Sequence, residues 1–138
     1  MDPKSIVRRF YDEVVGHGST AAADELLDPN LIDHGVPPAF PSGRAGFLQF
    51  AASLKAAFPD LRVDVEDLIT EGDRVAARVM VRGTHLGPLF GRLNATGRSA
   101  AWTGIDMFRL AKGRIVERWN ERDLLSLLQQ LGVDVGLF

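Results

Sequence analysis

The chain has 138 residues, of which 46% are hydrophobic and 25% charged, the size and balance of one soluble globular domain. We therefore predict a single domain over residues 1–138. A net charge of −2 excludes a basic surface for nucleic acid or an anionic membrane, and the absence of cysteine excludes disulfides and thiolate metal sites. No signal peptide or membrane-spanning run is visible, so we expect a cytoplasmic protein without a membrane partner.

Residues 1–58 indicate three helices and one short strand. The first helix is expected over residues 3–15 and the second over residues 19–27. A short strand at residues 31–35 leads into a proline-rich loop, and a third helix follows over residues 43–58. The apolar stripes of the first and third helices are Ile6, Val7, Phe10, Tyr11 and Val14, and Phe47, Phe50, Ala51, Leu54 and Phe58.

The second half of the chain alternates apolar and polar residues, which is typical of strands. Strands are expected over residues 61–70, from Val75 onward, and over residues 99–110 and 114–122, before a last helix at 124–131. Residues 86–97 are rich in glycine and proline and read as a loop or lid. In the strand expected over residues 61–70, one side carries Leu61, Val63, Val65 and Ile69. Helices segregated from an antiparallel meander indicate the α+β class, with helices covering one face of a curved sheet.

His85 ends a row of apolar residues on one face of a strand. The row consists of Val75, Ala77, Val79 and Val81, and His85 continues its two-residue period. Two interpretations are open. The imidazole is half-buried with one ring nitrogen bonded, or it sits at the mouth of a pocket that the valines line.

Asp106 is a carboxylate among apolar neighbours, on the same strand face as Trp102 and Phe108. A buried carboxylate is costly unless it is paired or protonated. One interpretation is a structural ion pair with Arg118 across the hairpin. The other is a carboxyl group whose pKa is tuned by its pocket for chemistry.

Three histidines are the candidate bases or metal ligands. His17 lies between two glycines where a helix ends, which favours a structural or solvent-exposed role. His34 and His85 each end a strand beside a loop, but no spacing is diagnostic of a metal site, so no metal is expected. The motifs of serine hydrolases, zinc proteases and nucleotide-binding folds are absent.

Several stretches together resemble the SnoaL-like polyketide cyclases of the NTF2-like superfamily: FYDEVV, LIDH, AAFPDLRVDVEDLITEGDRVAAR, GTHLG, GIDMFRLAKGRIVERW and LLQQLG. The resemblance covers nearly the whole chain. It implies an NTF2-like cone, in which a curved mixed sheet, mostly antiparallel, wraps around three N-terminal helices and encloses a pocket. It also implies an acid/base enzyme of cyclase or isomerase type that uses no cofactor and no metal.

The ketosteroid isomerases, a related branch, suggest roles for particular residues. Their general-base aspartate position looks like His34, their oxyanion-hole aspartate matches Asp106, and their catalytic tyrosine looks like Tyr11. In the cyclases, the positions of Asp106 and Asn120 look like a histidine and the acid/base aspartate. Asn120 therefore departs from the cyclase pattern.

The resulting hypothesis is aldol-type ring closure of a small hydrophobic, polyketide-derived substrate in secondary metabolism. We expect His34 to be the base, with Asp106 as its partner, either protonated or paired with Arg118. His85 is the third expected catalytic residue, and the three should face one cavity. The expected substrate contacts are Tyr11, Trp102, Arg118, Asn120, Phe50 and Phe90. Two alternatives stay open: another cofactor-independent enzyme (a hydroxylase, epoxide hydrolase or isomerase), and a non-catalytic small-molecule-binding protein.

A homodimer, or a tetramer built from it, is expected through the outer face of the sheet. Ile105, Met107, Ile115 and Trp119 form an apolar row there, which is large for a monomer. The alternative is that the last helix, with Leu124, Leu127 and Leu128, folds over this row.

Overall fold

The computed structural model describes residues 1–136, and it confirms the α+β class. The helical elements are α1 (Pro3–Arg9), the π-helix η1 (Phe10–Gly16), α2 (Thr20–Leu26), α3 (Gly43–Ala57) and α4 (Leu124–Gln130). The strands are β1 (Leu27–Asp33), β2 (Arg62–Glu71), β3 (Arg74–Thr84), β4 (Ser99–Ala111) and β5 (Arg114–Arg122). The first strand begins at Leu27, four residues earlier than the sequence pattern indicated.

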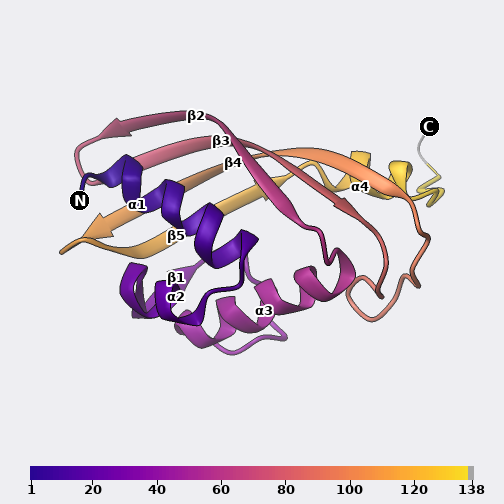
Figure 1. Ribbon diagram of the computed structural model, residues 1–138, viewed down its shortest axis with the longest axis horizontal. Coiled ribbons are helices and arrows are strands. Elements are labelled where there is room, and N and C mark those ends of the chain that lie inside the picture. The colour runs from indigo at the N-terminus through magenta and orange to yellow at the C-terminus, as the bar shows by residue number, and fades with distance from the viewer. Residues whose placement is uncertain (137–138) are drawn as a thin grey trace.

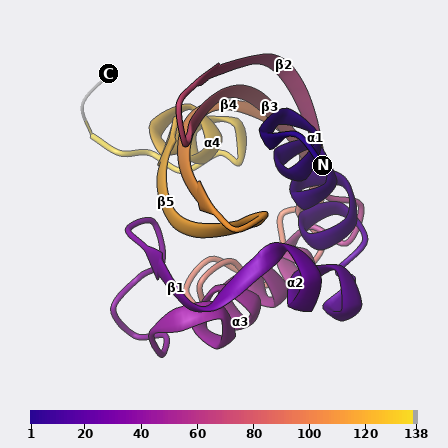
Figure 2. The same cartoon turned by 90° about the vertical axis from the view of Figure 1, so that its left-hand side faces the viewer.

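One mixed sheet with the order β1-β5-β4-β3-β2 forms the body of the molecule. Strand β1 pairs with β5 in parallel, and all other pairs are antiparallel. Figure 1 shows the long strands running over the helices, and Figure 2 shows the sheet end-on, arching over α2 and α3 while α1 borders one side. This is the expected NTF2-like cone.

The concave face of the sheet carries the residues expected to point inward. Val75, Ala77, Val79 and Val81 are at most 5% exposed. Phe10 of η1, Phe47 of α3 and Phe58, which directly follows α3, belong to the same core. The two-residue period of β3 and β4 therefore places their side chains correctly.

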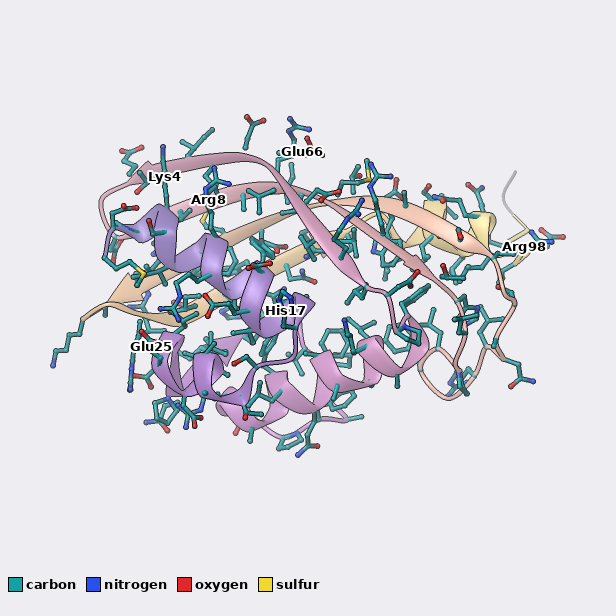
Figure 3. All side chains as sticks on the ribbon, in the orientation of Figure 1. Lys4, Arg8, His17, Glu25, Glu66 and Arg98 are labelled. Carbon is teal, nitrogen blue, oxygen red and sulfur yellow. The ribbon has the colours of Figure 1, made fainter. Side chains whose placement is uncertain are left out.

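Two β-bulges change which residues face the core. Glu66, labelled in Figure 3, is the extra residue of β2, because Val65 pairs with Val79 while Asp67 pairs with Arg78. Val116 is the extra residue of β5. A bulge reverses the inside–outside alternation beyond it. Ile69, expected on the same side of its strand as Leu61 and Val63, is consequently exposed, and Ile115, expected on the outer face, is buried.

The outer face of the sheet keeps part of the expected apolar row. Ile105 is 61% exposed and Met107 is 41% exposed, and Trp119 lies on the same face. Helix α4 does not cover this row, since its Leu124 and Leu127 line a cavity on the inner side.

Candidate active site

A cavity of about 380 Å³ opens between the concave face of the sheet and α3, within the size range of small-molecule sites. Its walls are mostly apolar, and its polar end is built by strand β5. The apolar lining includes Phe47, Phe50, Leu54, Leu61, Val81, Leu89, Phe90, Trp102, Leu124 and Leu127. The polar lining includes Arg118, Asn120 and Arg122.

Asp106 lies directly behind this polar end and accepts hydrogen bonds on both carboxylate oxygens. Arg122 binds it through two nitrogens, with Nη1–Oδ1 at 2.5 Å and Nη2–Oδ2 at 3.0 Å. Asn120 Nδ2 donates to Oδ1 at 2.9 Å, and the Tyr11 hydroxyl donates to Oδ2 at 2.5 Å. The Asp106 side chain is 0% exposed, so its surroundings alone set its charge state.

The surroundings of Asp106 favour the carboxylate. Burial raises the pKa of Asp106, but the hydrogen bond from Arg122 and the charges of Arg118 and Arg122 outweigh it, and the net pKa is below the usual value. Asp106 is therefore ionised at neutral pH. The expectation of a protonated Asp106 is wrong, because Arg122 and Asn120 supply donors that the apolar sequence context did not reveal.

Tyr11 is held against Asp106 by the π-helix η1, a helix type often found at functional sites. Burial, followed by the negative charge of Asp106, raises the pKa of Tyr11 far above its usual value. Tyr11 is therefore a neutral phenol that donates its proton to a hydrogen bond. It does not line the cavity but lies behind Asp106.

Arg118 forms an ion pair with Asp106 only at 3.8 Å, and its direct partner is Asp33, with Nη1–Oδ2 at 2.9 Å. Its guanidinium lies 5.5 Å from the ring centre of Phe10 and 5.2 Å from that of Phe47. Within residues 1–136 the buried Nε has no hydrogen-bond partner, which leaves one donor beside the cavity. Asp33 was not among the expected site residues; it directly precedes His34 and therefore points to the opposite face of β1.

Gly104 makes room for Arg122 and was also missed. The two residues are partners across the β4–β5 hairpin. A Cβ on Gly104 would lie 2.3 Å from Arg122 Nη1 and 2.6 Å from its Cδ. The glycine at this inward position therefore allows the guanidinium to reach Asp106.

Gly104→Ala is expected to displace Arg122 from Asp106 and to lower thermal stability, because the carboxylate then stays buried with fewer donors. A thermal melt should show a Tm several degrees lower. The exposed turn residue Gly72 has free space around an added Cβ, but it is unsuitable as a control because its φ of +59° would strain an alanine. Thr103→Ser, an exposed position on the outer-facing register of the same strand, is the better control. A Gly104→Ala variant with the wild-type Tm would mean that Arg122 can rearrange without loss of stability.

His34 borders the cavity, but its ring turns to the other face of β5. The imidazole stacks on Trp119 at 5.1 Å, and Nε2 lies 2.8 Å from Glu117 Oε2. The side chain is 45% exposed. Arg118 and Asn120 point inward from β5, so Glu117 and Trp119, which contact His34, point outward. The structure therefore does not bring His34 and Asp106 together.

His85 is fully buried behind the cavity wall, not at a pocket mouth. Its Nδ1 accepts a hydrogen bond from the Thr96 backbone N–H at 3.1 Å, and its ring packs on Phe58. It does not belong to the cavity lining. Of the two interpretations of His85, the structure therefore supports the buried, hydrogen-bonded imidazole. Its bond to Thr96 anchors the end of the 86–97 loop.

All the expected substrate contacts except Tyr11 lie in the cavity wall. Phe50, Phe90, Trp102, Arg118 and Asn120 all line the cavity. His17 stands at the end of η1 with its side chain mostly exposed (Figure 3).

Two further features of residues 1–136 bear on the site. No group of three His, Asp or Glu side chains in this range could hold a metal ion. No helix in the same range is long and apolar enough to cross a membrane.

The fold is that of a known protein family. The family model described as SnoaL-like polyketide cyclase matches residues 5–131, and the chain belongs to this family. No curated protein sequence matches the chain significantly.

Several solved structures are similar over nearly the whole chain. TsrD from Streptomyces laurentii is 28% identical with a TM-score of 0.86, and the match covers 97% of this chain and 99% of TsrD. IdmH from Streptomyces antibioticus, described as a proposed polyketide cyclase, is 35% identical with a TM-score of 0.84, covering 96% and 100%. AclR from Streptomyces galilaeus, described as a proposed hydroxylase, is 25% identical with a TM-score of 0.79, covering 94% of each chain.

Proposed function

We propose that the protein catalyses aldol-type ring closure of a hydrophobic polyketide-derived substrate without a cofactor. One observation carries the proposal: an apolar cavity ends in Arg122 and Asn120, and both donors are oriented by the ionised Asp106 behind them. Such a cavity suits a molecule that is apolar along its length and carries carbonyl groups at one end.

The donor end would stabilise negative charge on a substrate oxygen. Removing a proton next to a carbonyl places charge on that oxygen, and preorganised donors in a dry site favour this state. Arg122 and Asn120 supply such donors, and the buried Nε of Arg118 is a third candidate. Asp106 holds the Arg122 guanidinium at the end of the cavity through two hydrogen bonds, so its N–H groups need only turn to the substrate oxygen when the charge forms.

The proton acceptor in this proposal is Asp106, not His34. Asp106 does not line the cavity while Arg122 covers it. When Arg122 turns its hydrogen bonds to the substrate oxygen, it would uncover Asp106 to the substrate, and the loss of donors would raise the proton affinity of Asp106. Asp106 then takes the proton from the carbon next to the carbonyl. The resulting enolate carbon attacks a second carbonyl carbon and forms the new C–C bond. The alkoxide left on that carbonyl takes the proton back from Asp106, so the ring closes without net gain or loss of protons.

Asn120 is consistent with Asp106 as the proton acceptor. It occupies the position where the cyclases that this chain resembles carry the acid/base aspartate, and an amide cannot accept a proton as a carboxylate does. It donates to Asp106 instead, at 2.9 Å. Asp106 therefore accepts the proton in place of the aspartate that those cyclases carry at position 120. Asp106 and Asn120 are register partners across the β4–β5 hairpin.

Deuterium exchange tests this function without the natural substrate. 2-Tetralone, a bicyclic ketone with acidic α-hydrogens, would be incubated with the protein in D₂O and followed by proton NMR. We expect exchange above the buffer rate, and its loss in Arg122→Gln. Arg109→Gln is the matched control, since Arg109 pairs with Glu117 across the same hairpin but does not line the cavity. Tight binding of 2-tetralone with no faster exchange would indicate a binding protein in place of an enzyme.

His34→Gln separates the two candidate bases. If Asp106 is the acceptor, this variant keeps the exchange rate within about threefold of wild type, because the His34 ring lies with Trp119 and Glu117. A loss of roughly 10²–10⁴-fold, the usual contribution of a general base, would restore His34 to that role. The same exchange assay reads both outcomes.

We also propose a homodimer through the outer face of the sheet, where Ile105, Met107 and Trp119 remain uncovered by α4. Met107→Glu is expected to place like charges opposite each other across a two-fold interface and to yield monomers. Sedimentation velocity at micromolar concentration measures this. A wild-type monomer, or a variant dimer as tight as wild type, would contradict the proposed interface.

A further inference from the structure

The chain crosses the inner side of β5 where β1 ends. Asp33 pairs with Arg118 in register and binds its guanidinium, with Oδ2 2.9 Å from Nη1. Gly35 follows two residues later and lies over Asn120, which follows Arg118 by the same step. Gly35, Arg118 and Asn120 all line the cavity. The end of β1 therefore contacts two of the polar residues that line the cavity.

Gly35 is held close to the Asn120 side chain. Its N–H donates to Asp33 Oδ1 at 2.8 Å, so the carboxylate that binds Arg118 also fixes the turn at Gly35. A Cβ added to Gly35 would lie 2.4 Å from Asn120 Cβ and 3.1 Å from both Cγ and Oδ1, too close for any larger residue. The backbone of Gly35 is not left-handed. The contact with Asn120, and not the conformation of the turn, therefore calls for a glycine.

The same contact bears on the direction of the Asn120 amide. The three atoms nearest to an added Cβ are the Cβ, Cγ and Oδ1 of Asn120, so Gly35 does not face Nδ2 most closely. Nδ2 donates to Asp106 Oδ1 at 2.9 Å, which is the only direction that an ionised carboxylate allows. Because Asn120 Cβ is the nearest atom, rotation of the side chain cannot avoid an alanine at position 35. The two backbones would have to move apart.

We infer that Gly35 is a positioning residue, which keeps the Asn120 amide against Asp106 at the polar end of the cavity. The inference rests on the proposed donor role of Asn120 and adds a residue that acts through it. In Gly35→Ala, the gap of 2.4 Å must widen by about 1 Å to reach 3.4 Å, the lower end of ordinary van der Waals contact. A misplacement of about that size can lower an enzymatic rate by roughly 10²-fold.

Nitrogen-15 NMR of the Asn120 side-chain amide tests the placement directly. Its two N–H resonances are identified by their absence in Asn120→Ala. One of the two protons is hydrogen-bonded to Asp106 in the wild type, and Gly35→Ala is expected to shift its resonance upfield as that bond lengthens. Resonances of Asn120 that are the same in Gly35→Ala and wild type would overturn the inference.

The exchange of 2-tetralone, measured at several ketone concentrations, tests the effect on rate. Gly35→Ala is expected to lower kcat for exchange roughly 10–100-fold. Added to Asn120→Ala, where the amide is already gone, it should lower kcat by no more than about twofold, because both changes act through one group. Losses that multiply in the double variant would overturn the inference. Ala39→Ser is the control, since Ala39 is exposed in the same loop and does not line the cavity.

Thermal melts show whether the alanine meets Asn120 itself. Asn120→Gly removes the Cβ nearest to the added methyl group, whereas Asn120→Ala keeps it. Gly35→Ala should therefore lower the Tm by several degrees in wild type and in Asn120→Ala, but little in Asn120→Gly. If Gly35→Ala alone does not fold, its combination with Asn120→Gly should fold. Equal losses of Tm in all three backgrounds, or a combined variant that stays unfolded, would overturn the inference.

These outcomes are distinct from those that test the proposed chemistry. If the wild type does not exchange 2-tetralone, the cyclase proposal fails, and the Asn120 resonances and the Tm values still decide the role of Gly35. If the wild type exchanges 2-tetralone and Gly35→Ala leaves the Asn120 resonances unchanged, the chemistry stands and the inference fails.

Discussion

Asp106→Asn is expected to lower the rate of enzyme-catalysed 2-tetralone exchange by roughly 10²–10⁴-fold, the usual contribution of a general base. Asparagine keeps the shape of the side chain and can still accept a hydrogen bond from Arg122 or Tyr11. It cannot accept the proton from carbon, and it removes the charge that orients Arg122. A variant that folds and exchanges at the wild-type rate would exclude Asp106 from the chemistry.

The same variant has an expected signature in pH-dependent stability. The pKa of Asp106 is lower in the folded protein than in the unfolded chain, so its contribution to stability is fully present above the unfolded value of ~3.9. That contribution is lost as the pH falls through the folded-state pKa. The difference in unfolding free energy between wild type and Asp106→Asn should therefore shrink below about pH 4. A constant difference from pH 7 down to pH 3 would contradict an ionised Asp106.

Asp33→Asn is expected to cost about 3–5 kcal/mol of folding free energy, the usual loss when one partner of a buried ion pair is removed. Arg118 would keep its charge between Phe10 and Phe47 with only Asp106, 3.8 Å away, to balance it. Urea unfolding measures the change. A loss below 1 kcal/mol would show that Arg118 finds another partner or water.

Two controls separate a buried charge from a general loss of contacts. Asp33→Leu combined with Arg118→Met should recover much of the stability, because apolar pairs often replace buried ion pairs without loss. That double variant should still lose exchange activity, since it removes one cavity donor. Glu25→Gln, at the exposed bridge to Arg9, should leave the unfolding curve nearly unchanged.

Much of the fold follows from local patterns in the sequence. The alternation along β3 and β4 placed Val79, Trp102 and Phe108 inside, and all three are buried. The pattern failed at the bulges, because a single extra residue at Glu66 or Val116 changes no local composition. Only the pairing partner shows where the register shifts, so Ile69 and Ile115 could not be placed from sequence periodicity.

The candidate site was predictable only in part. Asp106 stood out because a carboxylate broke an apolar face, and it is the buried anion of the site. Arg122 gave no such signal, because an arginine near a strand end is ordinary on a surface. Its inward direction could have been inferred from the parity of Arg118 and Asn120. Asp33, the residue before His34, was not singled out, and in a strand one residue changes the face, so Asp33 and not His34 meets Arg118.

The apparent pKa of bound 2-naphthol is the most direct test of the donor end. This flat phenol resembles an enol, and its ionisation can be followed by ultraviolet absorption while it is bound. If Arg122 and Asn120 stabilise a negative oxygen, the pKa of bound 2-naphthol falls below its value in water, and Arg122→Gln abolishes the shift. A bound pKa equal to or above the value in water would contradict the proposed stabilisation.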